Sequence, residues 1–104
     1  MTDREMLELA AKAAGFVSYD HENSLATDMW SKGYRWNPLT DDGDALRLAV
    51  QLDLHVHPSG DEVWVSNPAT SLAEDVVFET YRGDPYAATR RAIVRAEAEI
   101  GRNT

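Results

Sequence analysis

The residues with the clearest potential for chemistry are Asp53, His55 and His57, which alternate along one short segment. In a β-strand, alternate side chains share a face and lie about 7 Å apart. Two imidazoles at that separation can share a metal ion, and a carboxylate can complete the site. Solvent-facing histidines on a strand need no such role. A metal or small-ligand site, or an enzyme built on it, is therefore kept as an alternative to the main prediction.

The second chemical signal is charge. The chain has 18 acidic and 10 basic residues, for a net charge of −8. Nucleic-acid backbones are bound by clustered Lys and Arg, so dispersed bases predict no direct nucleic-acid binding. An acidic surface can maintain solubility or attract a basic protein partner. The candidate residues for a partner-binding acidic face are Asp41, Asp42, Asp44, Asp61, Glu62, Glu74 and Asp75.

The sequence contains no motif that supports other kinds of catalysis. The chain has no cysteine, which excludes disulfides, thiolate zinc sites and cysteine nucleophiles and fits a reducing compartment. It contains neither a Gly-x-Ser-x-Gly nucleophile motif nor a glycine-rich phosphate loop. No catalytic residue and no cofactor is therefore predicted. Trp30, Tyr34 and Trp36 can serve as a ligand platform, but capping a small core is favoured.

Two features of the sequence bear on location. No apolar run approaches the length of a membrane span. Asp3, Glu5 and Glu8 lie among the first apolar positions, unlike the residues of a signal peptide. The expectation is a cytoplasmic protein.

The elements that position these residues start with a helix over 3–14. Thr2 and Glu5 have the spacing of a capping box, and Gly15 stands where the helix would end. The segment 16–36 predicts a short strand followed by an irregular hairpin.

The stretch from Trp36 to Asp53 predicts a helix over 41–52. Pro38 keeps the chain extended, and Thr40 is the predicted N-cap. The acids that follow suit the positive end of the helix dipole, and they lack the spacing of a calcium loop. The apolar face expected to anchor the core consists of Leu46, Ala49, Val50 and Leu52, with Ala45 and Leu48 on its flanks.

Three strands and a last helix are the remaining predicted elements. Alternation predicts strands over 52–58, 62–66 and 75–81, with a turn at 58–61. Asp84 is the predicted N-cap of the last helix, Pro85 its first residue and Gly101 its stop. On that helix, Arg90, Arg91 and Arg95 form a basic stripe, expected to pair with Glu97, Glu99 or neighbouring acids.

Three segments resemble small phage and prophage proteins of the phage ABA-sandwich type. They are the N-terminal helix from Met1 to Ala10, the run from Trp36 to Leu46, and the closing helix from Ala87 to Ala96. Where that family often has a Cys before the Arg-Ala of the last helix, this chain has Arg90. The resemblance implies a layered α/β fold and a phage or prophage origin, but no activity and no catalytic residues.

Together these observations predict one α+β domain over 1–104, with three helices packed on an antiparallel sheet of about three to five strands. The expected function is a non-enzymatic interaction protein made by a phage or prophage in the bacterial cytoplasm. One such protein would be an acidic inhibitor of a host defence complex such as CRISPR. It would mimic nucleic acid and bind a basic surface of the host complex. The alternatives are a ligand- or metal-binding protein centred on His55 and His57, and a homodimeric structural module.

Overall fold

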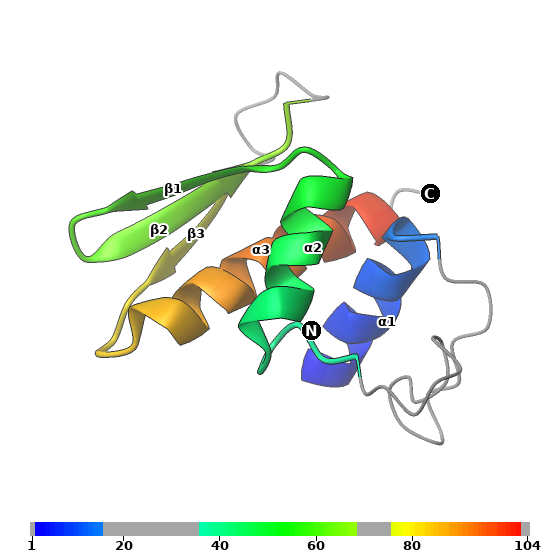
Figure 1. Ribbon diagram of the computed structural model, residues 1–104, viewed down its shortest axis with the longest axis horizontal. Coiled ribbons are helices and arrows are strands. Elements are labelled where there is room, and N and C mark those ends of the chain that lie inside the picture. Colours follow the sequence, from blue (N-terminus) through cyan, green and yellow to red (C-terminus); the bar gives the residue numbers. More distant parts are fainter. Residues whose placement is uncertain (1, 16–35, 69–75, 103–104) are drawn as a thin grey trace.

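The computed structural model describes residues 2–15, 36–68 and 76–102. Its elements, in chain order, are α1 (Asp3–Ala13), α2 (Asp42–Gln51), β1 (His55–Ser59), β2 (Glu62–Ser66), β3 (Val77–Thr80) and α3 (Pro85–Arg102). The strands form an antiparallel sheet in the order β1-β2-β3, and α3 runs along one face of it (Figure 1). This confirms the predicted α+β class. The short strand and the hairpin predicted within 16–36 lie, except for Trp36, outside the described residues.

Helix α3 is the centre of the molecule, since it packs against α1, α2 and the sheet. Its N-terminus is as predicted: the Asp84 carboxylate accepts from the backbone N–H of Ala87 at 3.0 Å. Small side chains line its buried sides and let its neighbours approach closely; these are Ala88, Ala92, Ala96 and Ala98.

The predicted stop at Gly101 is wrong, because α3 continues to Arg102. A Cβ built on Gly101 would lie 1.9 Å from the backbone oxygen of Leu9. This glycine is therefore required by the close crossing of α3 and α1 rather than by a change of chain direction. Helix α1 itself begins as predicted, with the reciprocal capping box of Thr2 and Glu5.

Helix α2 begins one residue later than predicted. The backbone N–H groups of Thr40 and Asp41 both donate to the Asn37 carbonyl, which closes a turn around Pro38. Asp41 is the N-cap, accepting from the Asp44 N–H at 2.8 Å. Thr40 is part of the preceding turn, so its prediction as N-cap is wrong.

The apolar face predicted for α2 is also wrong in its orientation. The buried residues are Ala45, Leu48 and Ala49, whereas Leu46 and Val50 are 62% and 66% exposed. The face of α2 that packs against α3 therefore carries two alanines and Leu48, and Leu46 and Val50 remain outside. The orientation is fixed at the first turn, where buried Asp44 accepts from the Asn37 N–H at 2.9 Å.

The end of α2 explains why the first strand is shorter than predicted. The Leu54 N–H donates to Ala49 O and the Asp53 N–H to Val50 O. Asp53 has φ of 54°, so these bonds form a Schellman motif with Asp53 in the left-handed position. Strand β1 therefore begins at His55.

The β1–β2 turn has the geometry that its residues favour. Ser59 pairs with Glu62, so Gly60 and Asp61 form a two-residue loop, and Gly60 has φ of 65°. Glycine is the residue that adopts this φ without steric cost. The inner face of the sheet is formed by Val63, Val65 and Val77, all buried. The predicted meander is confirmed.

Candidate functional site

The outer face of the sheet, opposite α3, carries an aligned row of rings. The strand register pairs His57 with Trp64, and Trp64 with Phe78. Because their strand neighbours Val63, Val65 and Val77 point inward, these three side chains point outward. We call His57, Trp64 and Phe78 the outer row.

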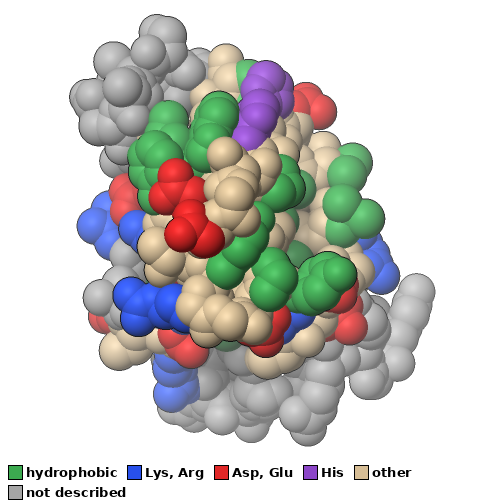
Figure 2. Space-filling model, turned by 90° about the vertical axis from the view of Figure 1, so that its left-hand side faces the viewer, with side chains coloured by type: hydrophobic (Ala, Val, Ile, Leu, Met, Phe, Trp, Pro, Cys, Tyr) green, Lys and Arg blue, Asp and Glu red, His purple; other side chains and the backbone are tan. Residues whose placement is uncertain are grey.

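The outer row is partly ordered by its own contacts. The rings of His57 and Trp64 stack with centroids 3.8 Å apart and planes 12° from parallel. The His55 ring lies edge-on to His57, with centroids 6.0 Å apart. Phe78 is 55% exposed. Figure 2 shows the two imidazoles in purple next to hydrophobic side chains at the top of the view.

This arrangement suits recognition by stacking. Aromatic faces attract planar groups and cations, and indole is the strongest of these rings for a cation. One face of the Trp64 indole is occupied by His57. Its other face, toward Phe78, has no ring contact among the residues that the structure describes. The outer row is therefore a pre-ordered surface that takes no part in the valine core on the other face of the sheet.

The three residues weighed as alternative metal ligands are not brought together. Asp53 lies in the C-terminal cap of α2, outside the strand that carries His55 and His57. Residues 2–15, 36–68 and 76–102 contain no group of three His, Cys, Asp or Glu side chains placed to hold one ion. The correction follows from the Schellman motif, which breaks the alternation on which the prediction relied.

The predicted acidic face is divided by the fold. Asp41 caps α2, and Asp42 forms an ion pair of 2.6 Å with Arg90. Asp44 is buried and cannot belong to any exposed face. Two others of the set, Glu74 and Asp75, lie outside the described residues.

The remaining two acids of the set, Asp61 and Glu62, lie at the end of the β1–β2 hairpin. The Asp61 carbonyl accepts from the Tyr81 N–H at 2.9 Å, so this end lies against the turn that leads into α3. Asp84 caps α3 at the same end of the molecule, which is at the left of Figure 1. Figure 2 looks onto this end and shows its acids interspersed with hydrophobic side chains.

The basic stripe of α3 is neutralised within the fold. Besides the Arg90–Asp42 pair, Arg95 lies 2.6 Å from the Glu79 carboxylate, and Arg91 lies 3.1 Å from that of Asp3. The predicted pairing with neighbouring acids is confirmed, although the partners belong to other elements rather than to α3. Glu97, one of the expected partners, points into the interior instead.

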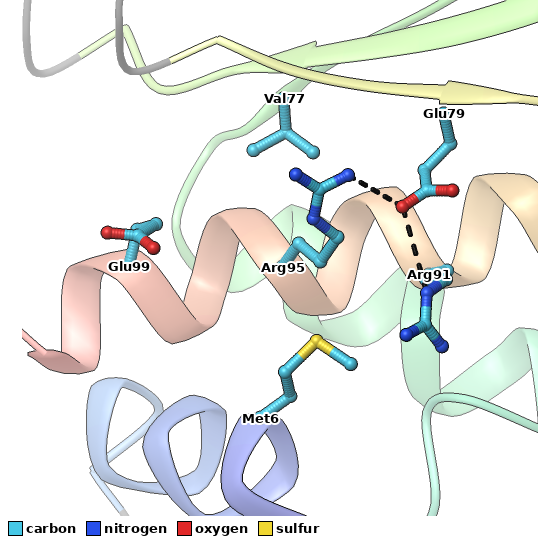
Figure 3. A pocket seen from close by; sticks show the side chains of 6 residues that line it. All are labelled: Met6, Val77, Glu79, Arg91, Arg95 and Glu99. Atoms are coloured by element: carbon cyan, nitrogen blue, oxygen red, sulfur yellow. Dashed lines mark hydrogen bonds and ion pairs between the residues drawn. The ribbon is translucent and has the colours of Figure 1, made fainter. Parts of the chain in front are cut away.

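Arg91 and Arg95 also line a pocket of about 340 Å³ between α1, β3 and α3 (Figure 3). The other lining residues are Met6, Val77, Glu79 and Glu99. Glu79 lies between the two guanidinium groups, and Arg95 also donates to the Phe78 carbonyl at 2.9 Å. With two carboxylates against two guanidinium groups, the pocket has no excess positive charge with which to hold an anion.

A second apolar surface lies between α2 and the start of β1. It is a groove of about 550 Å³ lined by five apolar residues, Leu46, Ala49, Val50, Leu54 and Val56, and by Asp53 and His55. Pro58 lies on the same edge strand. A proline cannot donate a hydrogen bond to an added strand, so it discourages pairing at this edge.

Glu97, which the sequence predicted only as an ion-pair partner for the arginines of α3, is the described carboxyl group whose pKa is raised by burial. Its side chain is fully buried, and neither carboxylate oxygen has a hydrogen-bond partner in the part of the chain that the structure describes. Burial raises the pKa of Glu97 to about 8. The sequence signal was its position, two helical turns after Arg90 and one before Gly101, on the side of α3 that meets the other helices.

Comparison with protein-family models, with curated proteins and with solved structures found no match to this chain. No helix in the described part of the chain has both the length and the apolar character that a membrane span requires.

Proposed function

We propose that this protein is a non-enzymatic interaction protein that binds a basic surface of another protein. The observation that carries this proposal is the distribution of ion pairs. The three arginines of α3 are engaged by Asp42, Asp3 and Glu79, as described above. The positive charge of the basic stripe is thus already paired and does not favour an anionic partner.

Carboxylates, in contrast, are left over. Exposed Asp61 and half-buried Glu62 have no cationic partner among the described residues, and the whole chain has a net charge of −8. Charge of this sign accelerates encounter with a basic partner and repels nucleic acid. The surface of the protein therefore favours a positively charged protein as its partner.

The resemblance to small phage and prophage proteins supports a more specific version of the proposal. In that version, a phage or prophage encodes this chain, and its acidic surface occupies the nucleic-acid-binding site of a host defence complex such as CRISPR. Proteins that bind nucleic acid depend on clustered Lys and Arg. An acidic protein of this size can compete for such a cluster without any catalytic step.

The test is affinity capture from a bacterial host lysate with the purified, tagged protein, followed by identification of the bound proteins. We expect a basic, nucleic-acid-binding protein to be retained at low salt and released as salt is raised, because exposed charges are screened. Added double-stranded DNA should compete with the protein for this partner. Retention that ignores both salt and DNA, or recovery of no basic protein, would refute the proposal.

A further inference from the structure

We propose that the outer row, with the adjacent acids Glu62 and Asp61, is a docking surface for arginine side chains on a basic segment of the partner. This inference rests on the proposed function and adds to it the surface used and the chemical group recognised. It depends on two independent features, namely the stacked rings and the unneutralised carboxylates beside them.

The rings provide the planar part of the site. Trp64 is held on one side by the nearly parallel ring of His57, so its position costs little further entropy on binding. Phe78, on the neighbouring strand, is paired with Trp64 in the register and is 55% exposed. Trp64 is half-buried, and a guanidinium group lying against the face of its indole that has no described ring contact, on the side of Phe78, would make favourable cation–π contacts.

The carboxylates provide the charged part of the site. Glu62 is two residues before Trp64 on β2 and so projects from the same face, about 7 Å away. Asp61 follows Gly60 in the adjoining turn. Arg82 lies beside these acids, because it donates at 3.1 Å to the hydroxyl of Thr80, the register partner of Glu62. Among the described residues Arg82 forms no ion pair with Glu62 or Asp61, and two carboxylates exceed its single positive charge.

Arginine fits both parts at once. Its guanidinium group is flat and weakly hydrated, stacks on aromatic rings and binds a carboxylate with two parallel hydrogen bonds. Lysine offers a compact, strongly hydrated charge that cannot stack in this way. The carboxylates exclude a phosphate backbone from the same surface. The geometry therefore favours an arginine-bearing protein segment over a lysine-rich segment or nucleic acid.

The experiment measures binding of a short oligoarginine peptide, and of an oligolysine peptide of equal length, to the intact protein by calorimetry. We expect saturable binding of oligoarginine, weakened by salt, and binding of oligolysine that is several-fold weaker. Phe78→Ser should reduce the affinity for oligoarginine about two- to fivefold, and Glu62→Gln should do the same. Chemical-shift changes on oligoarginine binding should centre on the Trp64 indole N–H.

The controls are Tyr86→Ser and Asp53→Asn. Tyr86 is a 70% exposed ring on α3, and Asp53 is an exposed acid at the end of α2. Neither belongs to the proposed surface, so both variants should bind oligoarginine like the parent protein. Thermal melting of each variant checks that it is folded, and Glu62→Gln keeps the test available if Phe78→Ser is unstable.

The possible failures can be told apart. Equal binding of the two peptides, together with unchanged affinity in Phe78→Ser and Glu62→Gln, would overturn this inference while leaving a basic partner in place. Loss of affinity in Tyr86→Ser equal to that in Phe78→Ser would overturn it as well. Absence of binding to either peptide, with no basic protein captured from lysate, would refute the proposed function itself.

Discussion

Replacement of Glu97 by glutamine should change how the stability of this protein depends on pH. Glu97 is fully buried in α3, and neither of its oxygens has a hydrogen-bond partner among the described residues. Burial raises its pKa from 4.5 to about 8, so the folded protein keeps this carboxyl protonated at neutral pH. The unfolded chain, exposed to water, releases the proton near the ordinary value.

The sign of the effect follows from proton binding. Between pH 4.5 and about 8 the folded state holds a proton that the unfolded state has lost, so the free energy of unfolding falls as pH rises. Each pH unit in this window costs about 1.4 kcal/mol. At pH 7 the loss from this one group is about 3 kcal/mol relative to acid conditions, and it reaches about 5 kcal/mol once pH exceeds the folded pKa.

Glutamine has nearly the same shape and cannot titrate. The free energy of unfolding of Glu97→Gln should therefore match that of the parent protein near pH 4.5 and exceed it by about 3 kcal/mol at pH 7. Urea denaturation at a series of pH values measures both curves. Glu97→Leu should be more stable than the parent throughout, since it also removes the oxygens that lack partners.

The matched control is Glu99→Gln, two residues further along α3. The Glu99 side chain is 52% exposed, so neutralising it should leave the slope against pH unchanged. Parallel pH curves for the parent protein and Glu97→Gln would refute the reasoning. They would mean that Glu97 is ionised in the folded state and that its charge is compensated.

Three further substitutions test the packing. Gly101→Ala should destabilise the fold by about 1–3 kcal/mol, because its Cβ would meet the Leu9 backbone. At Gly43 the three atoms nearest to an added Cβ all belong to side chains, those of Arg47 and Asp41, which can shift, so Gly43→Ala should cost less than Gly101→Ala; melting temperatures compare the two. Asp44→Ala leaves the Asn37 N–H without its acceptor and should lower the free energy of unfolding in urea by about 1–3 kcal/mol. Asp42→Ala, at the surface, should lower it by less than about 1 kcal/mol. Val50→Ser should change stability by less than about 0.5 kcal/mol, since Val50 is 66% exposed; a larger loss, or a change of mass in light scattering, would show that its groove is covered by a second copy.

Local signals in the sequence identified most of the elements. The capping box of Thr2 and Glu5, the Asp84-Pro85 helix start and the Gly60 turn each operate within a few residues, so a single stretch of sequence contains the whole interaction. The alternation of Val63 and Val65 likewise indicated the buried face of β2. These features settled the α+β class and the antiparallel meander.

Errors arose where a residue's role depends on a partner distant in sequence. The orientation of α2 followed from Asp44 and from close contact with α3, so Leu46 and Val50 turned outward although their periodicity suited a core. Gly101 looked like a stop because nothing nearby in sequence announces the Leu9 backbone that it meets. Asp53 lies in a helix cap rather than in the strand that carries His55 and His57, and alternation along the sequence does not reveal this cap.

The features of the candidate site also separate into those set by local sequence and those set by contacts between distant segments. The sequence by itself determined the excess of acidic charge and the alternation that puts His55 and His57 on one face of a strand. Only the tertiary structure decided that His57, Trp64 and Phe78 stand in one row, that the arginines of α3 are neutralised, and that Glu97 is buried. The physical reason is that charge and periodicity are properties of a chain segment, whereas pairing, burial and desolvation exist only between segments brought together by folding.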